Sequence, residues 1–269
     1  MLSNHTIAFI GGGNMAEAIL KGLLSTGVNA VTIHISEPMA ARREHLAEKY
    51  GVTVHAANTD AVQHADIVIL AIKPQVAESV IKGLAPAIDN KKLVITIMAG
   101  IRTDMIEAGL APASRVVRVM PNTPALVGAG ATAICAGANA STDDVNLVDQ
   151  IFALAGDTVR VEEKLMDAVT ALSGSGPAFV CAFIEALSDA GVKCGLSRDI
   201  SASLAVQTVL GTARMVHETG GHPALLREQV TSPAGTTIAG LHALEVGAFR
   251  GTVMNAVDAA CQRSKELGS

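Results

Sequence analysis

Short β-favouring runs alternate with amphipathic stretches over the first part of the chain. Residues 6–10 form such a run, three glycines follow it, and apolar residues then recur at helical spacing from Met15 to Leu24. Fully apolar runs of this length are typical of buried parallel strands. Because strand and helix patterns alternate, we expect an α/β domain with a parallel sheet.

The alternation continues to residue 161. It predicts further strands at residues 31–36, 52–54, 67–72, 93–98, 115–120, 127–135 and 158–161, and helices at 39–50, 75–84 and 143–155. From residue 164 to residue 267 only helical patterns occur. We therefore expect two domains, an α/β domain over residues 1–161 and an all-α domain over residues 162–269.

The glycine-rich turn after the first strand is the first candidate site. Gly11 suits a tight turn, Gly13 lets the backbone approach a pyrophosphate, and the small Ala16 lets the helix pack on the strand. The free amides and positive dipole end of that helix would face the anion. Such turns also occur without a ligand, but the strand–helix context favours a Rossmann-type dinucleotide-binding domain.

The end of the second strand bears on which dinucleotide is bound. Ser36 follows the apolar run directly, Glu37 comes next, and Arg42 and Arg43 lie on the helix beyond. A serine can bind a 2′-phosphate and an arginine can neutralise it, whereas an acidic residue favours the free ribose hydroxyls. This pattern favours NADP(H), with NAD(H) as the alternative; the two arginines are as readily explained as a solvated helix face.

Other candidate residues follow the ends of later strands. Lys73 and Pro74 follow one strand, Ala99 and Gly100 the next, and Asn122 a third. Because ligands bind at the carboxyl ends of parallel strands, we expect these residues around one crevice. The alternative for Pro74 and Gly100 is ordinary chain punctuation, and for Lys73 a solvated strand end.

Composition narrows the function classes. The chain has 269 residues, of which 49% are hydrophobic and 17% charged, with a net charge of −5, no Trp and one Tyr. These values argue against a nucleic-acid partner or an anionic membrane. The four cysteines are scattered and no signal-peptide pattern begins the chain, so we expect a cytoplasmic protein with no membrane association.

The helical half is unusually apolar. Residues 178–192 and 202–216 are apolar nearly all round. A helical domain of about a hundred residues cannot bury such helices on every side. We therefore expect a homo-oligomer with the helical half as its interface.

Two glycine-rich segments in the helical half precede helices. They are residues 173–178, Ser-Gly-Ser-Gly-Pro-Ala, and residues 230–237, Val-Thr-Ser-Pro-Ala-Gly-Thr-Thr. Helix capping explains each of them without a ligand. The amides at such a helix start also suit a substrate carboxylate.

Several kinds of catalytic motif are absent from the sequence. There is no H-E-x-x-H, no Cys/His cluster and no G-x-S-x-G, and the eight histidines show no ligand spacing. We expect no metal site. Because no acid–base pair emerges either, the pattern suits a substrate that needs little proton transfer, such as a polarised C=N bond.

Residues 225–245, LLREQVTSPAGTTIAGLHALE, resemble the signature of pyrroline-5-carboxylate reductases, which make proline. The chain is also similar to that family in FIGGGNMA at residues 9–16, AIKP at 71–74, MPNTP at 120–124 and LSGSGPA at 172–178. The resemblance implies a Rossmann-type domain followed by a helical dimerisation domain, a fold like that of 6-phosphogluconate dehydrogenase. It also implies a homodimer, which in some members assembles into decamers.

The resemblance also implies roles for individual residues. The implied cofactor-binding residues are Gly11, Gly12, Gly13, Asn14, Met15, Ala16, Ser36, Asn58, Ala71, Lys73 and Ala99, to which the strand ends add Pro74, Gly100 and Asn122. The implied substrate-binding residues are Ser175, Ser232, Gly235, Thr236 and Thr237, with Thr237 and Ser232 at the reacting ring. Some relatives carry a glutamate where this chain has Gly220, so a role for that carboxylate does not carry over.

Two other functions are consistent with parts of the pattern. A β-hydroxyacid dehydrogenase would share the two-domain plan, but its catalytic lysine is missing from residues 178–192, and Lys193 follows only at their end. A non-enzymatic NADP-binding protein would leave the segment 232–237 without a role. The expected activity is therefore reduction of 1-pyrroline-5-carboxylate to L-proline by NAD(P)H.

Overall fold

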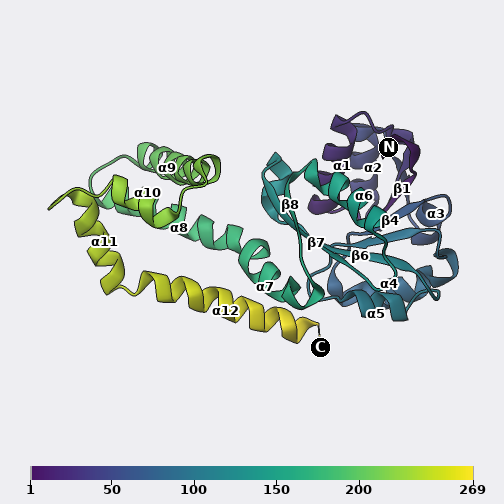
Figure 1. The fold of residues 1–269 in the computed structure, drawn as a ribbon. Helices are drawn as coiled ribbons and strands as arrows, with labels where there is room; N and C mark the ends of the chain where they lie inside the picture. Colours follow the sequence, from purple (N-terminus) through teal and green to yellow (C-terminus); the bar gives the residue numbers. More distant parts are fainter. Residues whose placement is uncertain (1, 269) are drawn as a thin grey trace. The chain divides into compact units, whose positions relative to one another are not determined.

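The computed structural model describes residues 2–268, and these form two compact units (Figure 1). One unit contains residues 2–175 and 259–268, and the other contains Gly176–Asp258. The first unit continues past residue 161 because side chains tie the following residues to the sheet. Arg118 forms an ion pair with Glu163, and the Asn122 amide donates to the Ser173 carbonyl at 3.1 Å. The domain boundary after residue 161 stays a prediction.

The first unit is built on an eight-stranded sheet with the order β3-β2-β1-β4-β5-β6-β7-β8. Its strands are β1 (Ile7–Ile10), β2 (Ile33–Ser36), β3 (Thr53–His55), β4 (Ile67–Leu70), β5 (Leu93–Thr96), β6 (Arg115–Met120), β7 (Gly130–Ala136) and β8 (Gly156–Arg160). All neighbouring pairs are parallel except β6 and β7. The order of β1 to β6 is that of a dinucleotide-binding fold, so the predicted α/β fold is confirmed.

Helices connect the strands and then make up the rest of the chain. In the sheet unit they are α1 (Asn14–Ser25), α2 (Ala40–Tyr50), α3 (Asn58–Val62), α4 (Ala77–Leu84), α5 (Thr103–Ala108), α6 (Thr142–Ala153) and α7 (Met166–Val169). Beyond them are α8 (Gly176–Lys193), α9 (Arg198–Thr219), α10 (Pro223–Gln229), α11 (Thr236–Val246) and α12 (Phe249–Leu267). Short helical turns η1 to η7 lie between these elements, among them η3 (Pro74–Val76), η5 (Thr123–Val127), η6 (Glu163–Leu165) and the π-turn η7 (Thr170–Gly174).

The strands alternate their side chains between two apolar layers. Ile7 and Phe9 of β1 pack with α1, α2 and α6 on one face, whereas Ala8 and Ile10 pack with α3, α4 and α5 on the other. Both faces of the central strands are therefore covered, which explains their unbroken apolar runs. Because helices cover both faces of the sheet, its uncovered part is the edge formed by the ends of the strands.

The structure differs from the predicted elements in several places. Residues 127–129 do not belong to the predicted strand, because η5 ends there and β7 begins at Gly130. Three other predicted strands are two residues too long, since β2 begins at Ile33, β4 ends at Leu70 and β5 ends at Thr96. The short helices α3 and α5 were not predicted, since five or six residues give too little periodicity. The segment 173–178 is not a loop that starts a helix, because the π-turn η7 leads directly into α8.

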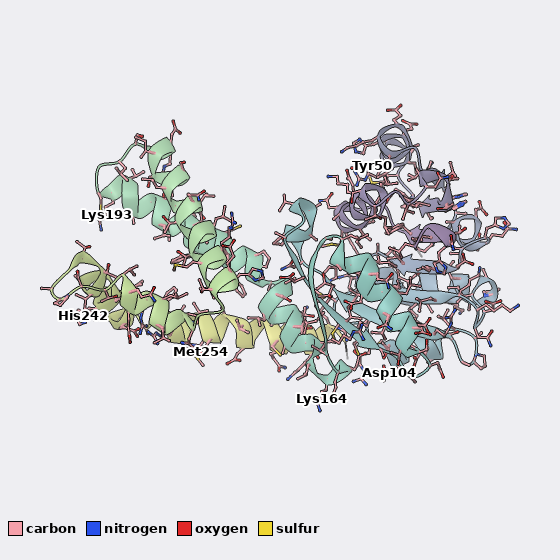
Figure 2. The ribbon with its side chains drawn as sticks, turned by 45° about the horizontal axis from the view of Figure 1, so that its top comes forward. Tyr50, Asp104, Lys164, Lys193, His242 and Met254 are labelled. Carbon is pink, nitrogen blue, oxygen red and sulfur yellow. The ribbon has the colours of Figure 1, made fainter. Side chains whose placement is uncertain are left out.

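The helical unit has few buried side chains of its own. Within Gly176–Asp258 the buried residues are Ser188, Ser201, Ala205 and Leu226. Large apolar side chains such as Leu204 and Val246 are exposed. Figure 2 labels Lys193 at the end of α8, His242 on α11 and Met254 on α12. The prediction that these helices are too apolar for one chain to bury is therefore confirmed.

One stretch has the length and composition of a membrane-spanning helix. It covers Glu163–Lys193, and a stretch of 18 residues within it has a mean hydropathy of 1.3, with 6% of those residues buried. A helix that packs on another subunit has the same apolar composition, so the stretch by itself does not distinguish the two environments.

Candidate nucleotide and substrate sites

A cleft of about 360 Å³ lies at the carboxyl ends of β1, β4, β5 and β6. It is lined by Gly13, Asn14, Met15, Ala71, Ile72, Lys73, Pro74, Ile97, Met98, Ala99, Met120 and Pro121. Seven of these residues are predicted cofactor-binding residues. Ile72, Ile97, Met98, Met120 and Pro121 were not predicted, although their positions beside the strand ends were a usable signal. The cleft therefore brings these seven predicted cofactor-binding residues together at one edge of the sheet.

The glycine turn before α1 has a different requirement at each position. Gly11 has φ +98°, and a Cβ there would lie 2.5 Å from the Ala71 carbonyl oxygen, so the turn needs glycine for the fold itself. Gly13 is the N-cap of α1 with φ −70°, and no atom of the chain lies within 4 Å of the position of its Cβ. Ala16 is buried against the sheet. Open space above Gly13 at a helix start suits a phosphate.

The peptide groups of Gly12 are held from behind by two side chains. The Glu37 carboxylate accepts from the Gly12 amide at 3.0 Å and from the Met39 amide at 3.0 Å. The Arg42 Nε donates to the Gly12 carbonyl at 2.7 Å. The sequence left Arg42 as either a partner of a 2′-phosphate or part of a solvated helix face, whereas in the structure Arg42 and Glu37 both hold the Gly12 peptide groups.

Glu17 anchors Arg42 and collects several donors under the turn. Its carboxylate lies 2.6 Å from Arg42 Nη2 and 3.1 Å from Lys49 Nζ, and it also accepts from the hydroxyl of Tyr50, which Figure 2 labels on α2. Burial alone would raise the pKa of Glu17, but the hydrogen bonds from Tyr50, Arg42 and Lys49 lower it to about 2. Glu17 is therefore ionised at neutral pH and keeps Arg42 in place.

Ser36 and Asn58, both predicted at the adenosine end, are in direct contact. The Ser36 hydroxyl donates to Asn58 Oδ1 at 2.6 Å, and Ser36 itself is buried. Arg43 donates to the carbonyl oxygens of Glu37 and Pro38 at 2.7 and 2.9 Å. A polar corner thus lies at the end of β2, with Arg43 beside the loop that follows.

The far end of the cleft adjoins the last turn of the chain. Lys73 is exposed beside the cleft, and Ala99 lies in the loop after β5. Next to Ala99, a Cβ on Gly100 would lie 3.3 Å from Leu267. The Ser264 hydroxyl donates to Asp167 of α7 at 2.7 Å. The predicted residue Gly100 is therefore covered by the end of α12 rather than open to the cleft.

Asn122 braces two segments that the sequence separates by about fifty residues. Its Oδ1 accepts from the Ala131 amide at 2.9 Å, and its Nδ2 donates to the Ser173 carbonyl. The segment at residues 120–124 and the segment at 172–175 therefore meet beside Met120, which lines the cleft. Ser175 directly follows the π-turn η7, and such turns are frequent at functional sites.

The helical unit carries the second predicted site at the start of α11. Gly235 is the N-cap of α11, and no side chain caps the helix. In residues 2–268 the hydroxyls of Ser232, Thr236 and Thr237 make no hydrogen bond. Ala234 has φ +56°, a strained conformation for a residue other than glycine. The free amides and hydroxyls at this helix start suit a carboxylate.

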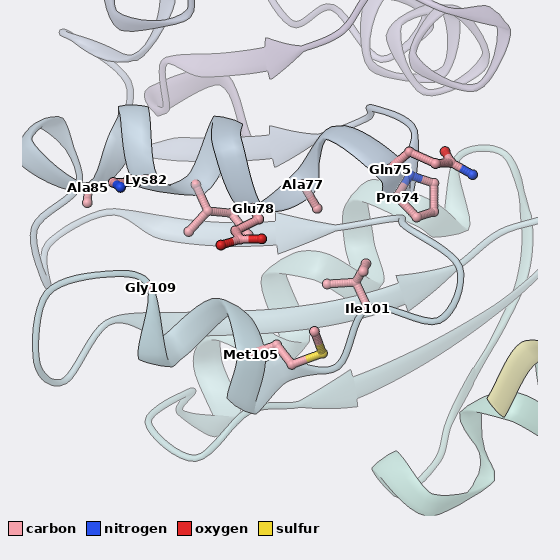
Figure 3. Close-up of a pocket in the computed structure, with 10 residues that line it drawn as sticks. Pro74, Gln75, Ala77, Glu78, Lys82, Ala85, Ile101, Met105 and Gly109 are labelled. Carbon is pink, nitrogen blue, oxygen red and sulfur yellow. The ribbon is translucent and has the colours of Figure 1, made fainter. Parts of the chain in front are cut away.

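A larger hollow of about 490 Å³ lies between α4 and α5 (Figure 3). Glu78 and Lys82 are its charged lining residues, and Ile81, Ile101 and Met105 supply much of its wall. It shares only Pro74 with the cleft at the strand ends. Apart from Pro74, the predicted cofactor-binding residues are therefore not part of this hollow.

Comparison with known proteins matches both units. Residues 163–267 match the family model for pyrroline-5-carboxylate reductase dimerisation, and residues 6–100 match that for NADP oxidoreductase, coenzyme F420-dependent. A pyrroline-5-carboxylate reductase of Glycine max is 47% identical over 265 residues, which cover 98% of this chain and 96% of the relative. The chain belongs to the pyrroline-5-carboxylate reductase family.

Solved structures of the pyrroline-5-carboxylate reductase family match the fold as well. The protein from Coxiella burnetii has a TM-score of 0.92 at 39% identity, covering 98% of this chain and 99% of that one. The protein from Plasmodium falciparum, solved with NADP bound, has a TM-score of 0.90 at 36% identity, covering 99% of each chain. The resemblance predicted from the motifs is therefore confirmed, and family membership decides against a β-hydroxyacid dehydrogenase.

Proposed function

We propose that the protein reduces 1-pyrroline-5-carboxylate to L-proline with NADPH, the last step of proline biosynthesis. The observation that carries this proposal is that the chain matches the pyrroline-5-carboxylate reductase family over its full length. The cleft at the carboxyl ends of the strands, where such sheets bind dinucleotides, supports it. The reduced nicotinamide supplies the hydride for the C=N carbon. The rest of the catalysis is binding and alignment by the residues of this chain.

The residues around the cleft fit an NADP molecule. The open backbone at Gly13, with Asn14 and Met15, would hold the pyrophosphate at the start of α1. Ser36 and Asn58 would hold the 2′-phosphate end, and Ala71, Lys73, Pro74 and Ala99 would line the nicotinamide half. The solved relative with NADP bound supports this cofactor. NADH is the weaker alternative, because Glu37 is turned towards the Gly12 and Met39 amides.

The start of α11 would bind the substrate. Its amides at Thr236 and Thr237 suit the substrate carboxylate, a contact of about 0.3–1 kcal/mol from the helix dipole and up to ~2 kcal/mol when partly buried. The Thr237 hydroxyl, with no partner of its own in residues 2–268, would lie at the ring nitrogen. Ser232 and Ser175 complete the proposed substrate contacts.

The protein would act as a homodimer joined through its helical unit. The exposed apolar side chains of α8, α9, α11 and α12 and the match to a dimerisation family support this arrangement. We also propose that these dimers assemble further into a decamer. A cytoplasmic location without membrane association is consistent with scattered, unpaired cysteines, and the partner subunit would then cover the apolar stretch at residues 163–193.

The test is the loss of NADPH and of NADH absorbance with 1-pyrroline-5-carboxylate, in the wild type and in Thr237→Ala. We expect turnover with both nucleotides, faster with NADPH, and a kcat/KM for the imine that is lower by about tenfold in Thr237→Ala, since one polar contact of about 1.4 kcal/mol is lost. The matched control is Thr252→Ala, because the Thr252 hydroxyl already donates to the Ala248 carbonyl at 3.1 Å. It should keep wild-type kinetics.

Three outcomes would contradict the proposal. Wild-type kinetics in Thr237→Ala would show that this hydroxyl has no contact with the substrate. Nucleotide binding without turnover of the imine would indicate a sensor rather than an enzyme. Oxidation of a 3-hydroxy acid in its place would indicate the dehydrogenase chemistry of the related two-domain enzymes.

A further inference from the structure

Two histidines form a pair on the edge of the sheet nearest the predicted 2′-phosphate corner. His34 Nδ1 and His55 Nε2 are 2.9 Å apart, and the two rings stack with centroids 5.2 Å apart at 16°. One nitrogen donates and the other accepts, so the bond survives when the donor ring takes up one more proton. Added charge would also strengthen it.

The strand register places this pair beside Ser36. In the parallel ladder of β2 and β3, Ser36 is opposite His55, and His34 lies two residues before Ser36 on the same face. The Glu37 amide donates to the His55 carbonyl at 3.1 Å, which extends the ladder past the strand end. Asn58 accepts from Ser36, and its Nδ2 has no hydrogen-bond partner in residues 2–268. Four polar side chains thus meet at one corner.

Neither ring of the pair is bound to a carboxylate. The charged or titratable groups around this corner are Glu37 after β2, Arg43 of α2, Asp60 of α3 and His64 after α3. The Glu37 carboxylate accepts from two backbone amides, and Asp60 Oδ1 lies 3.5 Å from the Thr59 hydroxyl. Within residues 2–268 neither ring of the pair forms an ion pair. A proton on the pair would therefore not be paired directly with a carboxylate.

The charge state of His34 changes in mild acid. Burial, and then the proximity of His55 and His64, holds the pKa of His34 below its usual value. His34 is therefore neutral at neutral pH and takes up a proton as the pH falls.

We propose that the His34–His55 pair is a specificity determinant for the nucleotide, which strengthens the preference for a 2′-phosphate over a free ribose hydroxyl when it is protonated. This inference rests on the proposed use of NADPH. A phosphate dianion is the ligand that a cation beside Ser36 and Asn58 would attract. NADH carries no charge at that position, so its affinity would change little.

The experiment measures Kd for NADPH and for NADH by fluorescence titration between about pH 8 and about pH 5.5. The variants are His55→Gln, His55→Lys and, as the matched control, His217→Gln, an exposed histidine of α9 that is not among the groups acting on His34. Phosphate itself takes up a proton near pH 6, which lowers NADPH affinity in every variant. The NADPH preference of a variant is its Kd for NADH divided by its Kd for NADPH. The informative quantity is therefore the NADPH preference of the wild type divided by that of His55→Gln.

That quotient should rise by about three- to tenfold as the pH falls, the effect of one charge at a partly exposed site. His55→Lys should prefer NADPH with no rise of its own, and His217→Gln should behave as the wild type. Equal pH profiles in the wild type and His55→Gln would overturn the inference and leave the proposed function intact. If neither nucleotide binds to the wild type, the proposed function itself fails. Thermal melting of each variant separates lost folding from lost recognition.

Discussion

Replacing Glu17 with glutamine tests how the glycine turn is supported. Glu17 is the anchor of Arg42, which in turn holds the Gly12 carbonyl, and its side chain is 11% exposed. The substitution keeps the shape of the side chain and removes its charge. Arg42 and Lys49 are then left beside a neutral amide. We expect both the stability of the sheet unit and the affinity for NADPH to fall.

The magnitude follows from the depressed pKa of Glu17. The pKa is about 2 against 4.5 for a free glutamate, so ionised Glu17 stabilises the folded state by about 3 kcal/mol. Because the folded-state pKa is lowered, this stability is present above about pH 4.5 and is lost as the pH falls towards 2. By the same relation, about 2 kcal/mol of it disappears between pH 7 and pH 3.

The assay is urea unfolding at one protein concentration, at pH 7 and at pH 3, with NADPH titrations at pH 7. Glu17→Gln should be about 2–3 kcal/mol less stable than the wild type at pH 7, and the gap should narrow by about 2 kcal/mol at pH 3. The Kd for NADPH should rise several-fold because the turn loosens. Glu44→Gln, on the exposed face of α2, is the matched control and should change neither quantity.

If the difference in free energy of unfolding between the wild type and Glu17→Gln stays constant from pH 7 to pH 3, this reasoning is refuted. The carboxylate would then contribute through its shape and hydrogen bonds and not through its charge. If Glu17→Gln is less stable but its Kd for NADPH is unchanged, Glu17 stabilises the fold without affecting nucleotide binding. Arg42 would then hold the Gly12 carbonyl without help from Glu17.

Two further predictions follow from the geometry. Gly11→Ala should prevent stable folding of the sheet unit, since the added Cβ would lie 2.5 Å from the Ala71 carbonyl oxygen. Gly13→Ala should keep the melting temperature of the wild type and lose affinity for NADPH, because no atom of the chain lies within 4 Å of the added Cβ. The reverse pattern would show that Gly13 is the structural residue. Burial, with the charge of Glu163 and its hydrogen bond, raises the pKa of the Cys135 thiol to about 11, against a smaller opposite effect of Arg118. In a chain with the other three cysteines changed to serine, Cys135 should resist a thiol reagent at about pH 8 until urea is added, and fast labelling of the native protein would contradict this.

Local chemistry was enough to predict that the strands exist, that a glycine turn follows the first of them and that a helix starts after residue 235. The apolar runs of β1, β4 and β5 need burial on both faces, and Gly11 and Gly235 lie where the chain passes from one element to the next. The exposed apolar faces of the helical unit were also predictable, because composition alone exceeded what one chain could cover. Each of these features depends on residues close together in the sequence.

Side-chain partners were beyond such reasoning. The sequence did not show that Arg42 and Glu37 hold Gly12, or that Asn122 donates to the Ser173 carbonyl. The coverage of Gly100 by the end of α12 could not be foreseen either. Nothing in the sequence near either partner marks such a contact, because each joins residues that only the folded sheet brings together.

The order of the strands along the chain, and the chemistry at their ends, can therefore be derived from the sequence, because hydrophobic periodicity and glycine geometry act within a few residues. The antiparallel pairing of β7, the support behind the glycine turn and the meeting of His34 with His55 were decided by the tertiary structure. A hydrogen bond between residues far apart in the chain depends on strand register, and register is set by the packing of the whole sheet.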